Sequence, residues 1–143
     1  MSKKKKIGEV LLEKNLLSKA QIQEVLEAQE SSNKLIGELL VERQMISELL
    51  LYQALAHQYQ MAFIDLSEKK IDTELIKEVP IELAEQYKII PIEKQHDNLI
   101  VALSNPRGAL PVADLCVLTG AKGIRTVLCT PDQIKEAIRK YYL

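Results

Sequence analysis

The sequence lacks the patterns that phosphate chemistry and nucleophilic catalysis need. Its 143 residues include only five glycines, and no GxxxxGK[ST] phosphate loop occurs, since residues 120–126 have the residue types but not the spacing. The two histidines, His57 and His96, stand far apart, and neither has a nucleophile pattern beside it. The carboxylates fall mainly on solvated helix faces, which leaves no acid/base pair. We therefore expect no catalytic residue and no enzyme activity from this chain itself.

Net charge, cysteine and long apolar runs are equally scarce. The formal net charge is -1, so no bulk field favours nucleic acid, and the lysines at 3–6 form the only basic cluster. Cys116 and Cys129 are not spaced as metal ligands and indicate reduced core thiols without a metal. No apolar run approaches the roughly 18 residues of a membrane span, and no signal peptide is apparent. We expect a cytoplasmic protein without direct membrane insertion.

The sequence does contain an internal repeat. A 24-residue pattern that begins at Lys6 returns at Leu35, 29 residues later. Identical residues occupy eight equivalent positions of the two copies, namely Ile7/Ile36, Gly8/Gly37, Glu9/Glu38, Leu11/Leu40, Glu13/Glu42, Ser18/Ser47, Leu26/Leu55 and Gln29/Gln58. Such self-similarity is the sequence signature of a duplicated structural unit.

Each copy is predicted to form a helical hairpin. Asn15 suits the left-handed residue that ends a first helix, and Ser18 with Gln21 has the form of a capping box for a second. Helical spacing then brings a glutamine onto the apolar face of each copy, at Gln29 and Gln58. A buried amide without a partner costs roughly 1–3 kcal/mol. Each glutamine is therefore expected to bond a neighbouring helix end or to meet a ligand.

The second half alternates strands and helices. The pattern predicts a strand or extended segment at 61–66, a helix at 71–79 capped by Asp72, and a helix from Pro80 to Tyr87. An edge or bulged strand at 89–93 around Pro91, a turn at 95–98 and a central strand at 99–103 are expected next. The remainder is predicted to form a helix at 112–119 closed by Gly120, a strand at 124–129, and a last helix capped by Thr130 with Gln133 completing a capping box. We expect an α+β fold: an amino-terminal helical bundle of two repeated helical hairpins (1–60), then a small α/β sandwich domain (61–143).

The duplicated motif resembles the MshEN-type domain of bacterial secretion and pilus assembly ATPases of the GspE and PilB types. That family's motif, roughly RLGxxLVxxGLIxxxxLxxxLxxQ written twice, is known for binding cyclic di-GMP. From Met61 onward the chain is also similar to the amino-terminal domain of type II secretion ATPases, in IDLSEKKID, LIKEVPIELAEQYKIIPIE and LIVALSNP. The resemblance covers the whole chain. It implies a non-catalytic module, because these ATPases hydrolyse nucleotide in a later domain.

The resemblance also implies a candidate ligand site, with each copy taking one half of cyclic di-GMP. Glycines let the ligand approach the backbone, and aliphatic side chains offer faces on which purines can rest. The first half-site would consist of Lys6, Ile7, Gly8, Leu11, Leu12, Ile22, Leu26 and Gln29, and the second of Leu35, Ile36, Gly37, Leu40, Val41, Leu51, Leu55 and Gln58. These positions also have the spacing of an interhelical core. No cofactor is required beyond this possible ligand.

The chain departs from the family motif at two positions in each copy. Lys6 and Leu35 stand where the family has arginine, with Lys34 one place early. Asn15 and Gln44 replace the second glycine of the motif. Because a bidentate contact from arginine to guanine contributes roughly 1–3 kcal/mol, losing two would weaken binding by about 2–6 kcal/mol.

Two functions of different class therefore remain open. The first, which the missing arginines favour, is a regulatory and docking domain that couples a secretion or pilus motor to the cytoplasmic domain of an inner-membrane protein, with the ATPase domain in cis or in trans. Such a module would be recruited to the inner face of the inner membrane. The second, which the glycines and glutamines favour, is a cyclic di-GMP sensor. Neither hypothesis involves nucleic acid.

Overall fold

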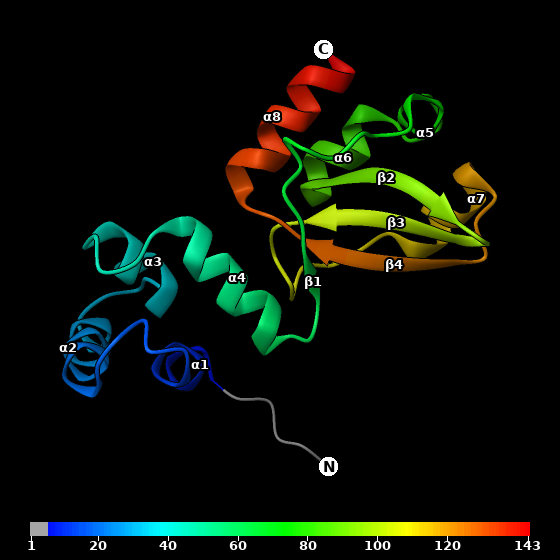
Figure 1. The fold of residues 1–143 in the computed structure, drawn as a ribbon. Coiled ribbons are helices and arrows are strands. Elements are labelled where there is room, and N and C mark those ends of the chain that lie inside the picture. The colour runs from blue at the N-terminus through cyan, green and yellow to red at the C-terminus, as the bar shows by residue number, and fades with distance from the viewer. Residues whose placement is uncertain (1–5) are drawn as a thin grey trace. The chain divides into compact units, whose positions relative to one another are not determined.

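The computed structural model describes residues 6–143, which divide into two compact units (Figure 1). The first, here called the helical unit, ends at Gln60, and the second, the sheet unit, begins at Met61. With eight helices and a four-stranded mixed sheet in this part of the chain, the predicted α+β class is confirmed. None of the helices between residues 6 and 143 is long and apolar enough to cross a membrane.

The helical unit is built from four helices, two from each copy of the repeat. They are α1 (Ile7–Glu13), α2 (Lys19–Glu30), α3 (Ile36–Glu42) and α4 (Glu48–Gln58). Helix α1 packs against α4, and α2 packs against α3, so the first helix of each copy lies on the second helix of the other. One shared core results, formed by Val10, Leu11, Leu17, Val25, Leu39, Leu40, Ile46, Leu51 and Ala54.

The turn between the two helices of a copy has the same geometry twice. Asn15 has φ 57° and its equivalent Gln44 has φ 60°, both in the left-handed region. The N–H of Asn15 donates to the carbonyl of Leu12, at 3.1 Å. The next N–H donates to the Leu11 carbonyl at 3.0 Å, and both bonds recur 29 residues later. This pairing is a Schellman motif, and it occupies the place where the family motif has glycine.

Capping residues start the second helix of each copy. The Ser18 side chain accepts from the N–H of Gln21 at 3.2 Å, while the Gln21 side chain accepts from the N–H of Ser18 at 2.8 Å. The predicted capping box is thus confirmed. In the second copy, Ser47 caps α4 by accepting from the N–H of Leu50 at 3.2 Å.

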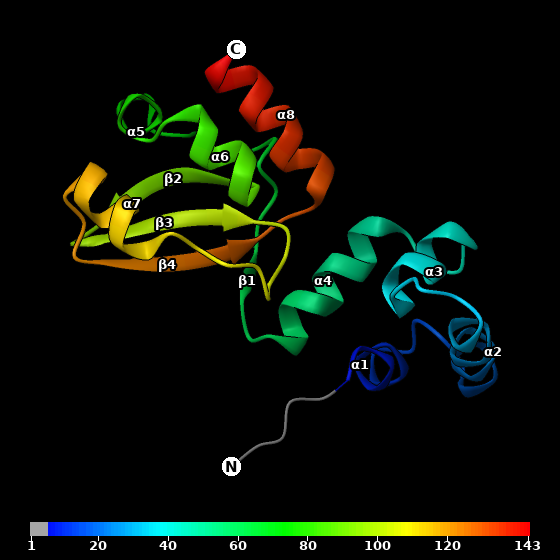
Figure 2. The same ribbon diagram turned by 180° about the vertical axis from the view of Figure 1, so that it is seen from behind.

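The sheet unit has the strand order β1-β4-β3-β2. Its elements are β1 (Ala62–Phe63), α5 (Thr73–Glu78), α6 (Ile81–Tyr87), β2 (Ile89–Gln95), β3 (Asn98–Leu103), α7 (Val112–Thr119), β4 (Gly123–Leu128) and α8 (Pro131–Tyr142). Strands β2 and β3 are antiparallel, whereas β4 runs parallel to both β3 and β1. Helices α6 and α8 cover one face of the sheet, and α7 crosses the other (Figures 1 and 2).

Local signals in the sheet unit match the structure except at two points. Pro91 lies in an edge strand and beside a register shift, as predicted. The segment at 61–66, predicted as a strand or an extended segment, pairs as a strand only at Ala62 and Phe63. Thr130 does cap α8, but the side chain of Gln133 does not complete a capping box. Instead its Oε1 accepts from the N–H of Leu66, at 3.1 Å, because a long-range backbone donor is available there.

Replacing Gln44 by glycine is expected to raise the free energy of unfolding by about 0.5–1 kcal/mol. Glycine adopts the left-handed conformation without the roughly 1–2 kcal/mol of strain that a residue with a side chain suffers there. Relief of this strain exceeds the entropic cost of introducing glycine. Asn15→Gly should gain less, because asparagine tolerates this region better than glutamine. Gln53→Gly, at an exposed position within α4, is the control and should lose about 1 kcal/mol. Urea unfolding followed by circular dichroism measures all three. Equal losses at positions 44 and 53 would contradict the role of the turn.

Candidate functional site

The sixteen candidate ligand positions divide into three groups by exposure. Leu11, Leu40 and Leu51 are buried in the shared core, at 0%, 1% and 4% exposure, so they support the site and do not present a free face. Lys6, Leu26 and Leu35 are exposed. The other ten are half-buried, namely Ile7, Gly8, Leu12, Ile22, Gln29, Ile36, Gly37, Val41, Leu55 and Gln58. A ligand on the helical unit would therefore meet these last two groups.

Each glycine faces the second helix of its own copy. A Cβ added at Gly8 would lie 3.5 Å from Cγ2 of Ile22, which is ordinary contact. A Cβ added at Gly37 would lie 3.1 Å from Cδ2 of Leu51, which is closer than side chains normally approach. Ile22 and Leu51 are equivalent positions of the repeat. The start of α1 therefore approaches α2 in the same way as the start of α3 approaches α4. Only in the second copy would an added Cβ make a close contact, which Leu51 would have to relieve by shifting a few tenths of an ångström.

The opening residue of each copy has the same backbone conformation. Lys6 and Leu35 are the N-cap residues of α1 and α3, both with φ -72° and ψ 154°, and neither side chain caps its helix. The two positions at which the family has arginine are therefore structurally equivalent here. One bears a cation, and the other bears an apolar side chain that is 67% exposed.

The two glutamines differ in their partners. The Nε2 of Gln29 donates to the carbonyl oxygen of Lys34 at 3.4 Å, just before α3 begins. Here the expectation that a glutamine bonds a neighbouring helix end is confirmed. The Oε1 of Gln58, in contrast, is buried and has no hydrogen-bond partner among residues 6–143. An unmet buried polar atom of this kind costs roughly 1–3 kcal/mol, and a donor from a ligand or water would reach it only if the Gln58 side chain turned outward.

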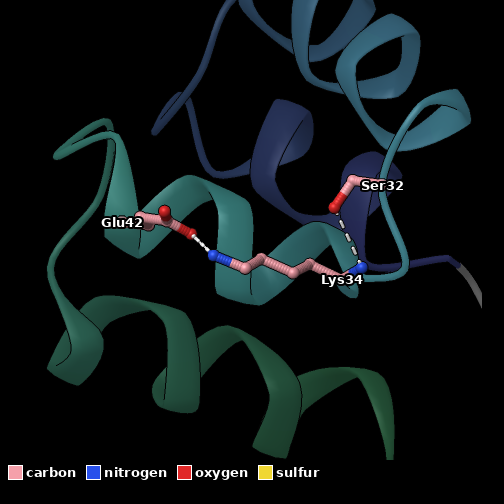
Figure 3. A network of polar contacts seen from close by, with 3 residues as sticks. All are labelled: Ser32, Lys34 and Glu42. Carbon is pink, nitrogen blue, oxygen red and sulfur yellow. Dashed lines mark hydrogen bonds and ion pairs between the residues drawn. The ribbon is translucent and has the colours of Figure 1, made fainter.

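Lys34 is held in the connector between the copies by two further contacts. Its N–H donates to Oγ of Ser32 at 3.1 Å, and its ammonium group donates to a carboxylate oxygen of Glu42 in α3 (Figure 3). The ion pair is about half exposed, with side chains 49% and 55% accessible. The cation that stands one place before the arginine position is thus paired within the helical unit.

The two cysteines are both free thiols, but only one lies in the core. Cys129 is fully buried, and burial raises the pKa of its thiol to about 12. Cys116 is half-buried on α7, less enclosed than the sequence predicts. A thiol with a pKa so far above neutrality stays protonated, so Cys129 does not serve as a nucleophile.

Comparison with known proteins identifies the class to which this fold and repeat belong. The model of a family described as the MshEN domain matches residues 59–143, and the chain belongs to this family, as the resemblance predicted. The matched segment is the sheet unit with the last two residues of the helical unit, Tyr59 and Gln60. The duplicated motif that resembles the family lies in the helical unit, before the matched residues. The helical unit and the sheet unit therefore support the same family assignment by different features.

Individual relatives extend the similarity over the repeat. The type IV pilus assembly ATPase PilB of Myxococcus xanthus (strain DK1622) is 36% identical over 137 residues, which are 96% of this chain and 24% of PilB. Bacteriophage adsorption protein B of Escherichia coli (strain K12) is 29% identical over 95% of this chain and 18% of its own length. The chain thus spans a quarter or less of these relatives. Its 143 residues contain the MshEN domain and no ATPase domain.

Two solved structures have the same fold. MshE, solved with cdg (cyclic di-GMP), superposes with a TM-score of 0.80 at 27% identity, covering 96% of this chain and 99% of that one. The N-terminal domain of XpsE superposes with a TM-score of 0.66 at 16% identity, covering 100% of both chains. The expected relation to the amino-terminal domains of this group is confirmed.

The two equivalent glycines are expected to respond differently to alanine. Gly8→Ala should raise the free energy of unfolding by up to about 1 kcal/mol, because alanine is the better helix former and its Cβ fits. Gly37→Ala should lower it by about 1 kcal/mol, because overpacking against the buried Leu51 outweighs helix propensity. Urea unfolding compares the two, and adding Leu51→Val should restore part of the loss at position 37. Equal effects at both positions would contradict the geometry described above.

Proposed function

We propose that the helical unit is a regulatory module that binds cyclic di-GMP, with one half of the nucleotide on each copy of the repeat. The observation that carries this proposal is the duplication itself. Cyclic di-GMP consists of two identical halves, and a two-fold ligand is matched by two equivalent sets of groups. The glycine, the opening residue, the left-handed turn and the terminal glutamine all occur twice, 29 residues apart. MshE, which shares this fold at 27% identity, has been solved with the same ligand.

In the proposed complex the ligand lies against the half-buried and exposed candidates. The aliphatic side chains at Ile7, Ile36 and Val41 offer apolar surface for the bases, and the glycines allow close backbone approach. The Oε1 of Gln58, which is buried, would accept a hydrogen bond from a guanine N–H once its side chain turned toward the ligand. Gln29 donates to the Lys34 carbonyl through Nε2, which leaves its Oε1 to accept from the other guanine.

Calorimetric titration of the 143-residue chain with cyclic di-GMP tests the proposal. We expect saturable binding with a Kd in the range of about 1–100 µM, weaker than an arginine-bearing site would give. Gln58→Ala should weaken binding at least tenfold, by about 1.4 kcal/mol, since it removes the proposed acceptor. Gln53→Ala, at an exposed position on the same helix, is the matched control and should bind like the parent chain.

Leu35→Arg provides the gain-of-function arm of the same titration. The side chain at 35 is exposed, so arginine is accommodated, and it restores the family residue in the second copy. Binding should become about tenfold to a hundredfold tighter, because one bidentate contact to guanine contributes roughly 1–3 kcal/mol. The proposal would be refuted if the parent chain gave no heat of binding up to about 1 mM ligand and the Leu35→Arg variant gave none either.

Docking to a motor assembly is the second candidate function, and one surface favours it. Helix α7 exposes Val112, Val117 and Leu118, at 47%, 84% and 40% accessibility. Exposed apolar side chains grouped on one helix are typical of protein contacts. As the PilB relative is a pilus assembly ATPase, the partners proposed are an ATPase domain in cis or in trans and the cytoplasmic domain of an inner-membrane pilus or secretion protein. Binding at this surface would place the module at the inner face of the inner membrane.

Replacing both Val117 and Leu118 by serine is expected to weaken that docking at least tenfold, because the contact loses two apolar side chains while the core is not disturbed. The measurement is biolayer interferometry with the cytoplasmic domain of the inner-membrane pilus assembly protein from the same genome. Leu143→Ser, at an apolar side chain 83% exposed at the chain end, is the matched control. Unchanged affinity in the double variant would exclude α7 as the docking surface.

A further inference from the structure

The two edges of the sheet are protected to different degrees. The outer edge of β2 contains Pro91 and a register shift next to it, and both features discourage the addition of another strand. The outer edge of β4 is paired with β1 only at Val127 and Leu128. Residues 123–126 of β4 therefore have a strand neighbour on one side only within the part of the chain that the structure describes.

Hydrogen bonds define which backbone groups face the open side of β4. The N–H of Cys129 donates inward to the Leu103 carbonyl at 3.0 Å, whereas the Leu128 carbonyl accepts outward from the N–H of Ile64 at 2.9 Å. Because inward and outward groups alternate along a parallel strand, Ile124 and Thr126 also direct their N–H and C=O groups outward. These groups are arranged as a template for one more strand.

A hollow lies beside this edge on the face covered by α6 and α8. Its volume is about 240 Å³, and its apolar lining includes Ile64, Ile100 and Val127. Arg125 is opposite Ile100 in the register of β3 and β4 and also lines the hollow. Alternate side chains of an added strand would point toward this face, with room for an apolar group next to Arg125.

The charges around the hollow leave one cation unmatched. Glu93 accepts from the ammonium of Lys69 at 3.3 Å and from the amide of Gln95 at 2.8 Å, so its charge is compensated. Arg125 is exposed and makes no hydrogen bond or ion pair with any residue between 6 and 143. An acidic partner is therefore complementary to this edge. A second copy is not, since antiparallel pairing about the middle of β4 would bring two Arg125 side chains together.

We propose that residues 123–126 of β4 take an extended acidic segment of a partner protein as an added strand. The backbone of the segment bonds Ile124 and Thr126, one carboxylate pairs with Arg125, and a neighbouring apolar side chain lies in the hollow. This site belongs to the sheet unit and uses none of the residues proposed for cyclic di-GMP. It is also separate from the exposed side chains of α7.

The experiment uses the isotope-labelled 143-residue chain and a short end-capped peptide that alternates valine and glutamate. We expect chemical-shift changes and slowed amide exchange at Ile124 and Thr126 as the peptide is titrated to about 1 mM. A peptide with lysine in place of glutamate should bind about threefold to tenfold more weakly. Absence of shifts at about 1 mM would overturn the proposal, as would shifts confined to other residues.

Two variants separate the backbone and charge components. Thr126→Pro removes an outward N–H that the ladder with β3 does not use, and it should abolish binding, while Thr126→Val keeps the N–H and should bind normally. Arg125→Glu should reverse the preference toward the lysine peptide, which tests the proposal even if the proline variant does not fold. An unchanged preference in Arg125→Glu would overturn it. Concentration-dependent pairing of β4 with itself, detected by the same amides without peptide, would identify a second copy as the occupant instead.

Discussion

The helical unit depends on the sharing of one core by the two copies of the repeat. Its first helices have seven residues each, far shorter than the roughly 12–15 residues at which isolated helices become even marginal in water. Their stability comes from burying Val10 and Leu11 against α4, and Leu39 and Leu40 in the same core. Neither copy can complete this burial alone. The duplication is therefore a condition of folding as well as a source of two equivalent candidate ligand positions.

This sharing explains why a motif that looks like a ligand signature is largely a folding signature. Leu11, Leu40 and Leu51 fill the core, and the left-handed turn directs the chain from one helix to the next. Asn15 and Gln44 make that turn with the same hydrogen bonds, so loss of the second glycine leaves the architecture intact. Leu35 is different, because its exposed side chain contributes nothing to the core. Only departures of the second kind would bear directly on the proposed affinity for cyclic di-GMP.

Local chemistry explains how much of the fold could be predicted from the sequence. The capping box at Ser18, the left-handed ends at Asn15 and Gly120 and the irregular edge at Pro91 depend on a few neighbouring residues, and all match the structure. The features that could not be predicted depend on distant groups. Gln133 leaves its expected cap for a backbone N–H 67 residues away, and β1 is too short to cover β4. The packing of α1 on α4 has the same origin, since helical spacing defines an apolar face but not its partner.

The same distinction applies within the candidate site, where the segment after each copy breaks the symmetry of the sequence. After Gln29 the chain enters a short connector, and the Lys34 carbonyl comes within reach of the glutamine amide. The residue at the equivalent distance after Gln58 is Phe63, which lies in β1 of the sheet unit. The second copy is therefore followed by a strand and not by a connector of this kind, and the oxygen of its glutamine is buried without a partner among the described residues. Two identical glutamines thus acquire different surroundings from their neighbours in the chain. In the proposed complex, a symmetric ligand would meet a glutamine anchored through its amide in one half-site and a glutamine with a buried oxygen in the other, so the two halves need not contribute equally to binding.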